Sequence, residues 1–187
     1  MSLYLTVILG GMFLIAAGVA LGYETSYLQT LGFTALAIVL VILVDGMVAM
    51  VARLLPKRFA DHTKKYFTVS AEEKKLYERL KIRLWKDKIP EIGHFTGFRK
   101  NKIVDPKSVA YIERFLLECC YGQIGHFWSV IFGFIILLFY PLTHTWVSLS
   151  LPVAIVNGVL NLLPICVLRY NVYKLKILLK TNLKKLK

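Results

Sequence analysis

Four long apolar runs dominate the chain, and polar or charged residues bound each of them. The runs cover residues 3–21, 31–52, 124–140 and 146–168. Each is close to the roughly 20 residues that a helix needs to cross the hydrocarbon core of a bilayer. Short polar turns join the runs in pairs. The pattern therefore predicts two membrane-spanning helical hairpins, and the expected fold class is all-α and integral to the membrane.

The residues between the hairpins, 53–118, follow a different pattern, and none of their stretches is apolar enough to span. Ser70 with Glu73 three residues later predicts a helix start, since both can bond the free backbone N–H groups there. Leucines then recur every four residues from Leu76 to Leu84 beneath a lysine-rich face. This pattern is typical of a helix on a membrane surface, although the leucines could instead pack on the protein.

A basic tail, residues 169–187, follows the fourth run, and its interleaved leucines predict an amphipathic surface helix. No Lys or Arg precedes the first run, so the charged start of a signal peptide is missing and we expect a retained span. At this length one domain is the default, and we expect a single membrane domain over residues 1–187.

Composition and charge sharpen this picture. The chain is 57% hydrophobic with a net charge of +13, and all 24 Lys and Arg residues lie in 53–118 or 169–187. Basic loops stay in the cytoplasm, so we expect a multi-pass cell-membrane protein whose centre and two termini are cytoplasmic. Beside membrane spans, a basic surface indicates anionic lipid headgroups or phosphate-bearing substrates, and we expect no nucleic-acid partner.

His126 begins the third run and is a candidate general base, because imidazole can take a proton near neutral pH. Its place beside Trp128 also suits an interfacial anchor, so both interpretations stay open. Glu118 lies eight residues earlier, about 80° around a continuous helix and about 12 Å along it. The two side chains could touch only if the helix broke, for example at Gly122 or Gly125.

Polar residues inside the apolar runs are further candidates. Asp45 interrupts the second run; it could bind a substrate hydroxyl or a buried cation, or make a helix–helix hydrogen bond. Asn161, Arg169 and Asn171 mark the end of the fourth run, and Pro164 leaves a backbone carbonyl without its helical partner. Such residues either kink a helix or shape a pocket.

A cluster of cations surrounds Trp85 in the central segment. Its members are Lys81, Arg83, Lys86 and Lys88, with Arg99, Lys100 and Lys102 downstream. They could hold the phosphates of an activated donor. Alternatively, they attract anionic headgroups, which is worth about 1 kcal/mol per cation.

Three places together resemble a known family, the glycosyl-4,4'-diaponeurosporenoate acyltransferases, which perform the last acylation in staphyloxanthin-type carotenoid synthesis. The places are the stretch 82–90, the pair of Glu118 and His126, and the group that runs from Asn161 to Asn171. The order and spacing agree over about residues 50–185. The chain departs from the family pattern at Tyr121 and Gln123, where an arginine and an acidic residue are usual.

The resemblance implies a membrane acyltransferase that moves a fatty-acyl group from a soluble thioester donor to a hydroxyl of a glycolipid-like or other amphipathic acceptor. The donor would be acyl-coenzyme A or an acyl carrier protein, and no permanently bound cofactor or metal is expected. His126 would be the base and Glu118 its positioning residue. Donor phosphates would bind at Arg83, Trp85 and Lys86, and Asp45, Asn161, Arg169 and Asn171 would contact substrate.

Two other classes stay open from the sequence. One is a membrane methyltransferase or reductase of the isoprenyl or steroid type, which also ends in a polar motif and a basic tail. The other is a non-enzymatic four-span transporter or assembly protein, although the long basic segment 53–118 is not needed for transport. The chain has no P-loop, GxGxxG or GxSxG motif.

Overall fold

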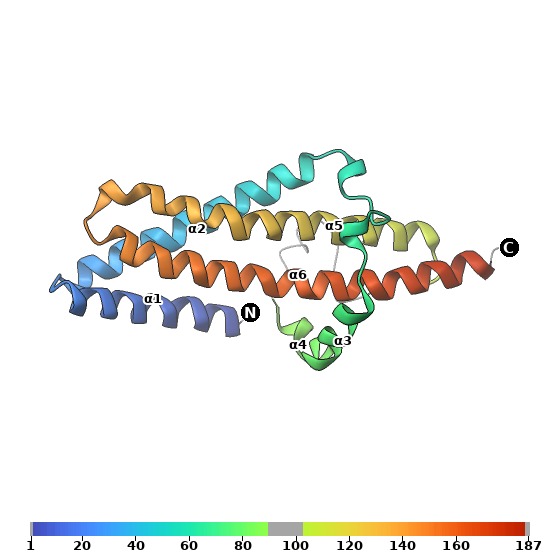
Figure 1. Cartoon of the computed structure of the whole chain (residues 1–187), viewed down its shortest axis with the longest axis horizontal. Coiled ribbons are helices and arrows are strands. Elements are labelled where there is room, and N and C mark those ends of the chain that lie inside the picture. The colour runs from blue at the N-terminus through green and yellow to red at the C-terminus, as the bar shows by residue number, and fades with distance from the viewer. Residues whose placement is uncertain (1, 90–102, 186–187) are drawn as a thin grey trace. The chain divides into compact units, whose positions relative to one another are not determined.

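The structure, a computed structural model, describes residues 2–89 and 103–185, and within these ranges it contains helices and no strand. The elements are α1 (Ser2–Gly22), α2 (Tyr27–Leu54), η1 (Lys57–Phe59), η2 (Lys65–Phe67), α3 (Ala71–Arg79), α4 (Ile82–Trp85), η3 (Lys86–Lys88), α5 (Val109–Phe132), η5 (Gly133–Leu142) and α6 (Trp146–Lys185) (Figure 1). Four segments are long and apolar enough to cross a membrane: α1, α2, α5 with η5, and α6. The predicted all-α fold with four spans is confirmed.

The chain packs into two compact units. The first contains Met1–Val51 and Gly125–Leu162, and the second contains Ala52–Ile124 and Leu163–Lys187. None of the 24 Lys and Arg residues belongs to the first unit, whose sequence carries only Glu24 and Asp45 as acidic residues. Because charges are costly in hydrocarbon, the first unit is suited to the bilayer, and the second, which carries every cation, to the aqueous side.

The first unit is held together around Trp146, which is fully buried. Its indole meets the ring of Phe33 edge-on at 6.5 Å, and its Nε1–H donates to the carbonyl of Ile136 at 2.8 Å. At the two hairpin turns, the hydroxyls of Tyr23 and Ser148 lie 2.8 Å apart. Both turns therefore lie at the same end of this unit, as two hairpins side by side require.

Pro164 lies inside α6 without ending it. Proline has no N–H to donate to the carbonyl four residues earlier, that of Leu160. The hydroxyl of Tyr4 on α1 donates to this carbonyl at 3.1 Å. The carbonyl that the sequence predicted to be free is thus satisfied across the first unit, which a buried polar group in a bilayer needs.

The second unit is built on α5 and the end of α6. Phe115 and Leu116 of α5 are buried against Leu168, Leu175 and Leu179 of α6. The tail is therefore not a separate surface helix, as the leucine pattern had suggested, because α6 continues to Lys185 and packs its apolar face on α5. An apolar stripe fits a partner helix as well as a membrane surface, and the pattern alone cannot distinguish them.

The central helix also differs from its prediction. Ser70 caps α3 as expected, accepting a bond from the backbone N–H of Glu73 at 3.1 Å. However, α3 ends at Arg79, and the backbone enters the left-handed region at Lys81, whose φ is 50°. The leucine stripe is therefore divided between two short helices, and Leu84 is 70% exposed. A leucine on each side of such a turn no longer shares a face with the other.

Candidate active site

A cluster of polar side chains lies inside the first unit, which otherwise is strongly apolar. Asp45 comes from α2, His126 and Ser129 from α5, and Asn157 and Asn161 from α6. One oxygen of the Asp45 carboxyl accepts from Nδ2 of Asn161 at 2.8 Å, and the other accepts from Nδ2 of Asn157 at 3.2 Å. The Ser129 hydroxyl also bonds to this carboxyl. Nδ1 of His126 lies 2.8 Å from Oδ1 of Asn161.

The orientation of the Asn161 amide follows from its neighbours. Its Nδ2 lies 3.1 Å from the backbone carbonyl of Asn157, which can only accept a hydrogen bond. The nitrogen must therefore face Asn157 and Asp45, and the amide oxygen must face His126. Since that oxygen only accepts, Nδ1 of His126 carries the hydrogen, and a neutral ring has its basic lone pair on Nε2.

This arrangement fixes the orientation of the His126 imidazole. Asn161 holds the tautomer and the ring plane of His126, and Asp45 in turn holds the Asn161 amide. An aligned imidazole with its lone pair on Nε2 can take a proton from a hydroxyl. Within residues 2–89 and 103–185, no three His, Cys, Asp or Glu side chains are grouped to hold a metal ion.

A glycine on η5 makes room for the cluster. A Cβ added to Gly133, which is buried, would lie 2.8 Å from Nδ2 of Asn157 and 3.5 Å from Val41. Only glycine lets the backbone approach the amide this closely. Sequence reasoning missed Gly133, Asn157 and Ser129 as site residues. The signal was the helical spacing, because Ser129 follows His126 by three positions and Asn161 follows Asn157 by four.

A groove adjoins the cluster in the same unit. Apolar side chains of α1, α2 and α6 line it, and its wall includes the polar side chain of Asn157. The volume of the groove is about 50 Å³, and the groove is open to its surroundings. Gly11 of α1 forms part of the wall, and a Cβ added there would meet nothing within 4 Å. The groove is therefore a small, open apolar recess beside Asn157.

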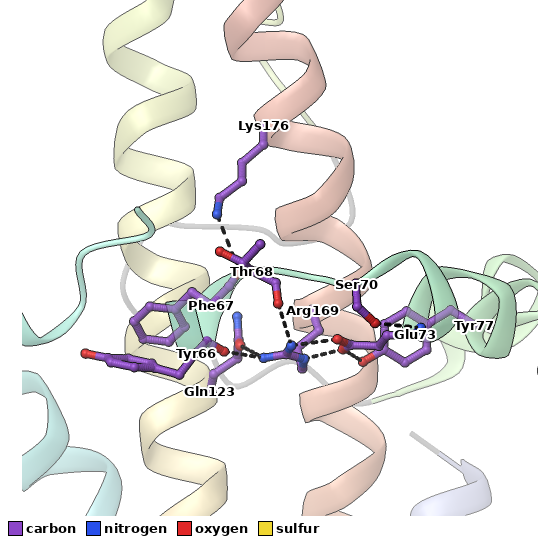
Figure 2. A network of polar contacts seen from close by, with 9 residues as sticks. All are labelled: Tyr66, Phe67, Thr68, Ser70, Glu73, Tyr77, Gln123, Arg169 and Lys176. Carbon is purple, nitrogen blue, oxygen red and sulfur yellow. Dashed lines mark hydrogen bonds and ion pairs between the residues drawn. The ribbon is translucent and has the colours of Figure 1, made fainter. Parts of the chain in front are cut away.

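The second unit contains a separate polar network around Arg169, shown in Figure 2. Arginine has five N–H donors. Nε bonds to Glu73; Nη2 donates to Glu73 at 2.7 Å and to the carbonyl of Thr68 at 3.2 Å. Nη1 donates to the carbonyl of Tyr66 at 2.6 Å and to Oε1 of Gln123 at 3.5 Å. All five donors are used, so Arg169 has none left for a substrate carbonyl.

Glu73 is the main partner in this network. It also accepts from the hydroxyl of Tyr77 and from the backbone N–H of Ser70. Burial by itself would raise the pKa of Glu73, but the hydrogen bonds from Arg169 and Tyr77 and the charge of Arg169 hold that pKa below its usual value. Burial and the bond to Glu73 raise the pKa of Tyr77. The network thus joins α3 and the loop before it to α6 through an ionised pair.

Glu118, the predicted partner of His126, has a different environment. Its carboxylate pairs with Arg53 at 3.3 Å. The expected contact with His126 required a break at Gly122 or Gly125, but α5 is a single helix from Val109 to Phe132. Gly122 instead lets α6 approach, since an added Cβ would lie 2.9 Å from Cδ1 of Leu168. His126 is positioned by Asn161, not through a helix break.

The predicted donor-phosphate residues do not form a shared pocket in the described structure. Nε1 of Trp85 donates to the carbonyl of Leu80 at 2.8 Å, and Nζ of Lys86 pairs with Asp87 at 3.1 Å. Arg83 is exposed. The downstream cations Arg99, Lys100 and Lys102 lie outside the described residues. Asn171 is 8% exposed, and its Nδ2 has no hydrogen-bond partner within the part of the chain that the structure describes.

Comparison with known proteins supports the acyl-transfer hypothesis over the methyltransferase, reductase and transporter alternatives. Searches of curated proteins and of solved structures found no match. The sequence model of the glycosyl-4,4'-diaponeurosporenoate acyltransferase family matches residues 56–181. The matched part contains His126 and Asn161, whereas Asp45 and α1 precede it. Because it makes up about two-thirds of the chain, the chain belongs to the glycosyl-4,4'-diaponeurosporenoate acyltransferase family.

Proposed function

We propose that this acyltransferase moves a fatty-acyl group from a thioester donor to a hydroxyl of an amphipathic acceptor lipid, with His126 as the general base. The observation that carries the proposal is the chain of hydrogen bonds from Asp45 through Asn161 to Nδ1 of His126. These three hydrogen-bonded residues all lie in the first unit, which is apolar and contains no lysine or arginine. A membrane-held acceptor would thus meet an oriented base.

The chemistry follows from the position of the lone pair. Nε2 of His126 takes the proton of the acceptor hydroxyl while the hydroxyl oxygen attacks the thioester carbonyl. The tetrahedral intermediate then collapses, the carbon–sulfur bond breaks, and Nε2 returns the proton to the departing sulfur. The imidazolium that forms between these steps donates from Nδ1 to Asn161, whose amide is held by Asp45. Such positioned base catalysis typically supplies about 10²–10⁴-fold in rate.

The groove beside Asn157 would contact a few methylenes of the donor's acyl chain. Its walls are apolar, and its polar residue is hydrogen-bonded to the same carboxyl that holds Asn161. A chain lying along α1 would place its polar end near the base. The contribution of such a groove is orientation, because a bound and aligned donor converts a collision into a step within one complex.

A substitution at His126 tests the base. We expect His126→Gln to lower turnover at least about 100-fold, since a base worth about 10²–10⁴ is removed while a polar side chain is kept. The measurement is acyl transfer by the purified full chain from radiolabelled thioester to extracted acceptor lipids. His144→Gln is the matched control, because His144 lies at the hairpin turn beside Tyr23. Full activity of folded His126→Gln protein would refute the assignment.

A substitution at Asn161 tests the positioning. We expect Asn161→Leu to lower kcat with little change in KM, and to move the limb of the pH–rate profile that reports the histidine. The reason is that Nδ1 of His126 loses its acceptor and the ring its fixed tautomer. A purely structural role would instead lower the amount of active enzyme and leave the shape of the pH profile unchanged, which would contradict the proposal.

A further inference from the structure

An open cleft with three lysines and a largely apolar lining lies in the second unit beside the network around Arg169, and Figure 2 shows one of these lysines, Lys176, in that network. His62 and Thr63, in the loop between η1 and η2, form one side. Lys176, Lys180 and Lys184 of α6 line the other at four-residue spacing, so they share one helix face. The volume of the cleft is about 450 Å³. None of the site residues predicted from the sequence lines this cleft.

Among the described residues, Asp61 and Glu113 act on His62 through their charges, and Asp61 also acts on Lys176, but neither forms an ion pair with a lysine of the cleft. Across residues 2–89 and 103–185, no carboxylate forms an ion pair with any of the three lysines, and Nζ of Lys176 reaches only the carbonyl of Phe67, at 3.5 Å. Nδ1 of His62 is buried and has no hydrogen-bond partner among the described residues. A buried polar atom without a partner is costly, so a ligand that bonds to it would gain affinity.

We propose that this cleft binds the phosphate groups of a coenzyme A thioester, the small-molecule form of the donor in the proposed function. The lysines provide charge and the His62 ring and Thr63 hydroxyl provide directional groups. An acyl carrier protein would need an interface of about 800 Å² on each partner, much broader than an open cleft between a loop and one helix face. The cleft therefore favours a small polyanion.

The distance of the cleft from the membrane favours a soluble ligand over lipid headgroups. The apolar part of α6 ends at Leu168, and Lys180 and Lys184 lie 12 and 16 positions further along the same helix. At 1.5 Å per residue they are about 18 and 24 Å beyond that end along the axis. The headgroup layer on one side of a bilayer is only about 5–8 Å thick. A helix near the membrane normal carries these lysines past the headgroups, where a soluble donor is found.

Direct binding tests the proposal without relying on turnover. Coenzyme A is titrated into the detergent-purified full chain by calorimetry, with Lys180→Glu compared against Lys185→Glu. Lys185 is exposed, lies on the same helix and does not line the cleft, so the control makes the same charge change. We expect Lys180→Glu to weaken binding about ten- to a hundred-fold, as loss of a charge-assisted contact does, and Lys185→Glu to change it less than threefold.

Two further measurements distinguish coenzyme A from other anions. Binding to vesicles of anionic lipid should fall equally in the two variants, and inorganic phosphate should compete with coenzyme A in the wild type. Three results would overturn the proposal. The two variants could weaken coenzyme A binding equally, or Lys180→Glu could weaken only the binding to vesicles. Alternatively, the protein could bind acyl carrier protein but not coenzyme A. If coenzyme A binds as expected but the His126→Gln variant is fully active, the proposed base is refuted and the proposed binding site in the cleft still holds.

Discussion

At the scale of single residues, Arg169 changes role once its contacts are known. The family resemblance implied a substrate-binding arginine, but all five of its N–H donors are used by Glu73, Gln123 and the carbonyls of Tyr66 and Thr68. An arginine saturated in this way holds a loop and a helix in place. The residues that can do chemistry are those with a directed lone pair, and His126 fits that description.

The Glu73–Arg169 pair predicts how the second unit responds to acid. The pKa of Glu73 is lowered in the folded protein, so the pair stabilises the fold above the unfolded pKa, and this stability is lost as the pH falls through the folded pKa. We expect Glu73→Gln to lower the melting temperature at pH 7 and to flatten its decline as the pH falls below about 4.5, the ordinary pKa of a glutamate. Thermal unfolding of detergent-solubilised protein measures both.

Glu72→Gln is the matched control for that experiment. Glu72 is exposed in the same first turn of α3 and contributes no bond to Arg169 among the described contacts. Its substitution should leave the acid slope as in the wild type. Parallel slopes in the wild type and Glu73→Gln would show that the pair is too well solvated to contribute, as many exposed pairs are.

At the scale of helices, glycines decide how closely elements approach. Gly122 and Gly133 lie where an added Cβ would meet a neighbouring side chain at 2.9 and 2.8 Å. Gly11 differs, because space surrounds it and it forms part of the groove wall. The same residue type therefore admits a neighbouring helix at two places and leaves open space at the third.

That difference predicts a change in acyl-chain length. Gly11→Phe should fill part of the groove and shift preference to shorter acyl donors. Excluding two or three methylenes, each worth about 0.8 kcal/mol, should lower kcat/KM for a long-chain donor about 30-fold. A series of thioesters of increasing length measures it. Gly10→Phe is the control, since Gly10 is exposed on α1 and does not line the groove. Similar profiles in both variants would contradict the acyl-chain assignment.

At the scale of the whole molecule, the distribution of positive charge follows the division of the chain into two packed units. Every lysine and arginine belongs to the second unit, and the first has none. α6 has 40 residues, about 60 Å of helix, which is twice the thickness of the hydrocarbon core. Part of it must therefore leave the membrane, and its basic part is the second-unit end. The rule that basic segments stay on the cytoplasmic side then predicts that both termini face the cytoplasm.

Cysteine labelling tests this orientation. In a background lacking Cys119, Cys120 and Cys166, single cysteines at Ser26 and Thr143 should react with an impermeant thiol reagent added to intact cells. A cysteine at Ser108 should react only after the cells are permeabilised, because residue 108 lies in the basic unit. Labelling of Ser108→Cys alone in intact cells would show that the basic unit faces outward.

Local properties of the chain determined a large part of this protein. Spans, turns and the division of charge depend on composition over about 20 residues, so they are readable without packing. The Ser70 cap depends on two residues three positions apart and was predicted in the same way. Asp45 and Asn161 were predicted because polar groups in apolar runs are costly, and His126 because imidazole at the start of a span can take a proton near neutral pH.

Tertiary structure decided which of these residues meet. Asp45 and Asn161 are 116 positions apart, and their bond depends on how α2 and α6 are rotated about their axes. The same applies to Glu118, which pairs with Arg53, and to the tail leucines, which are buried by α5. A periodic pattern says that a helix has an apolar face but not which surface covers it. Packing alone chose Asn161 as the partner that orients His126.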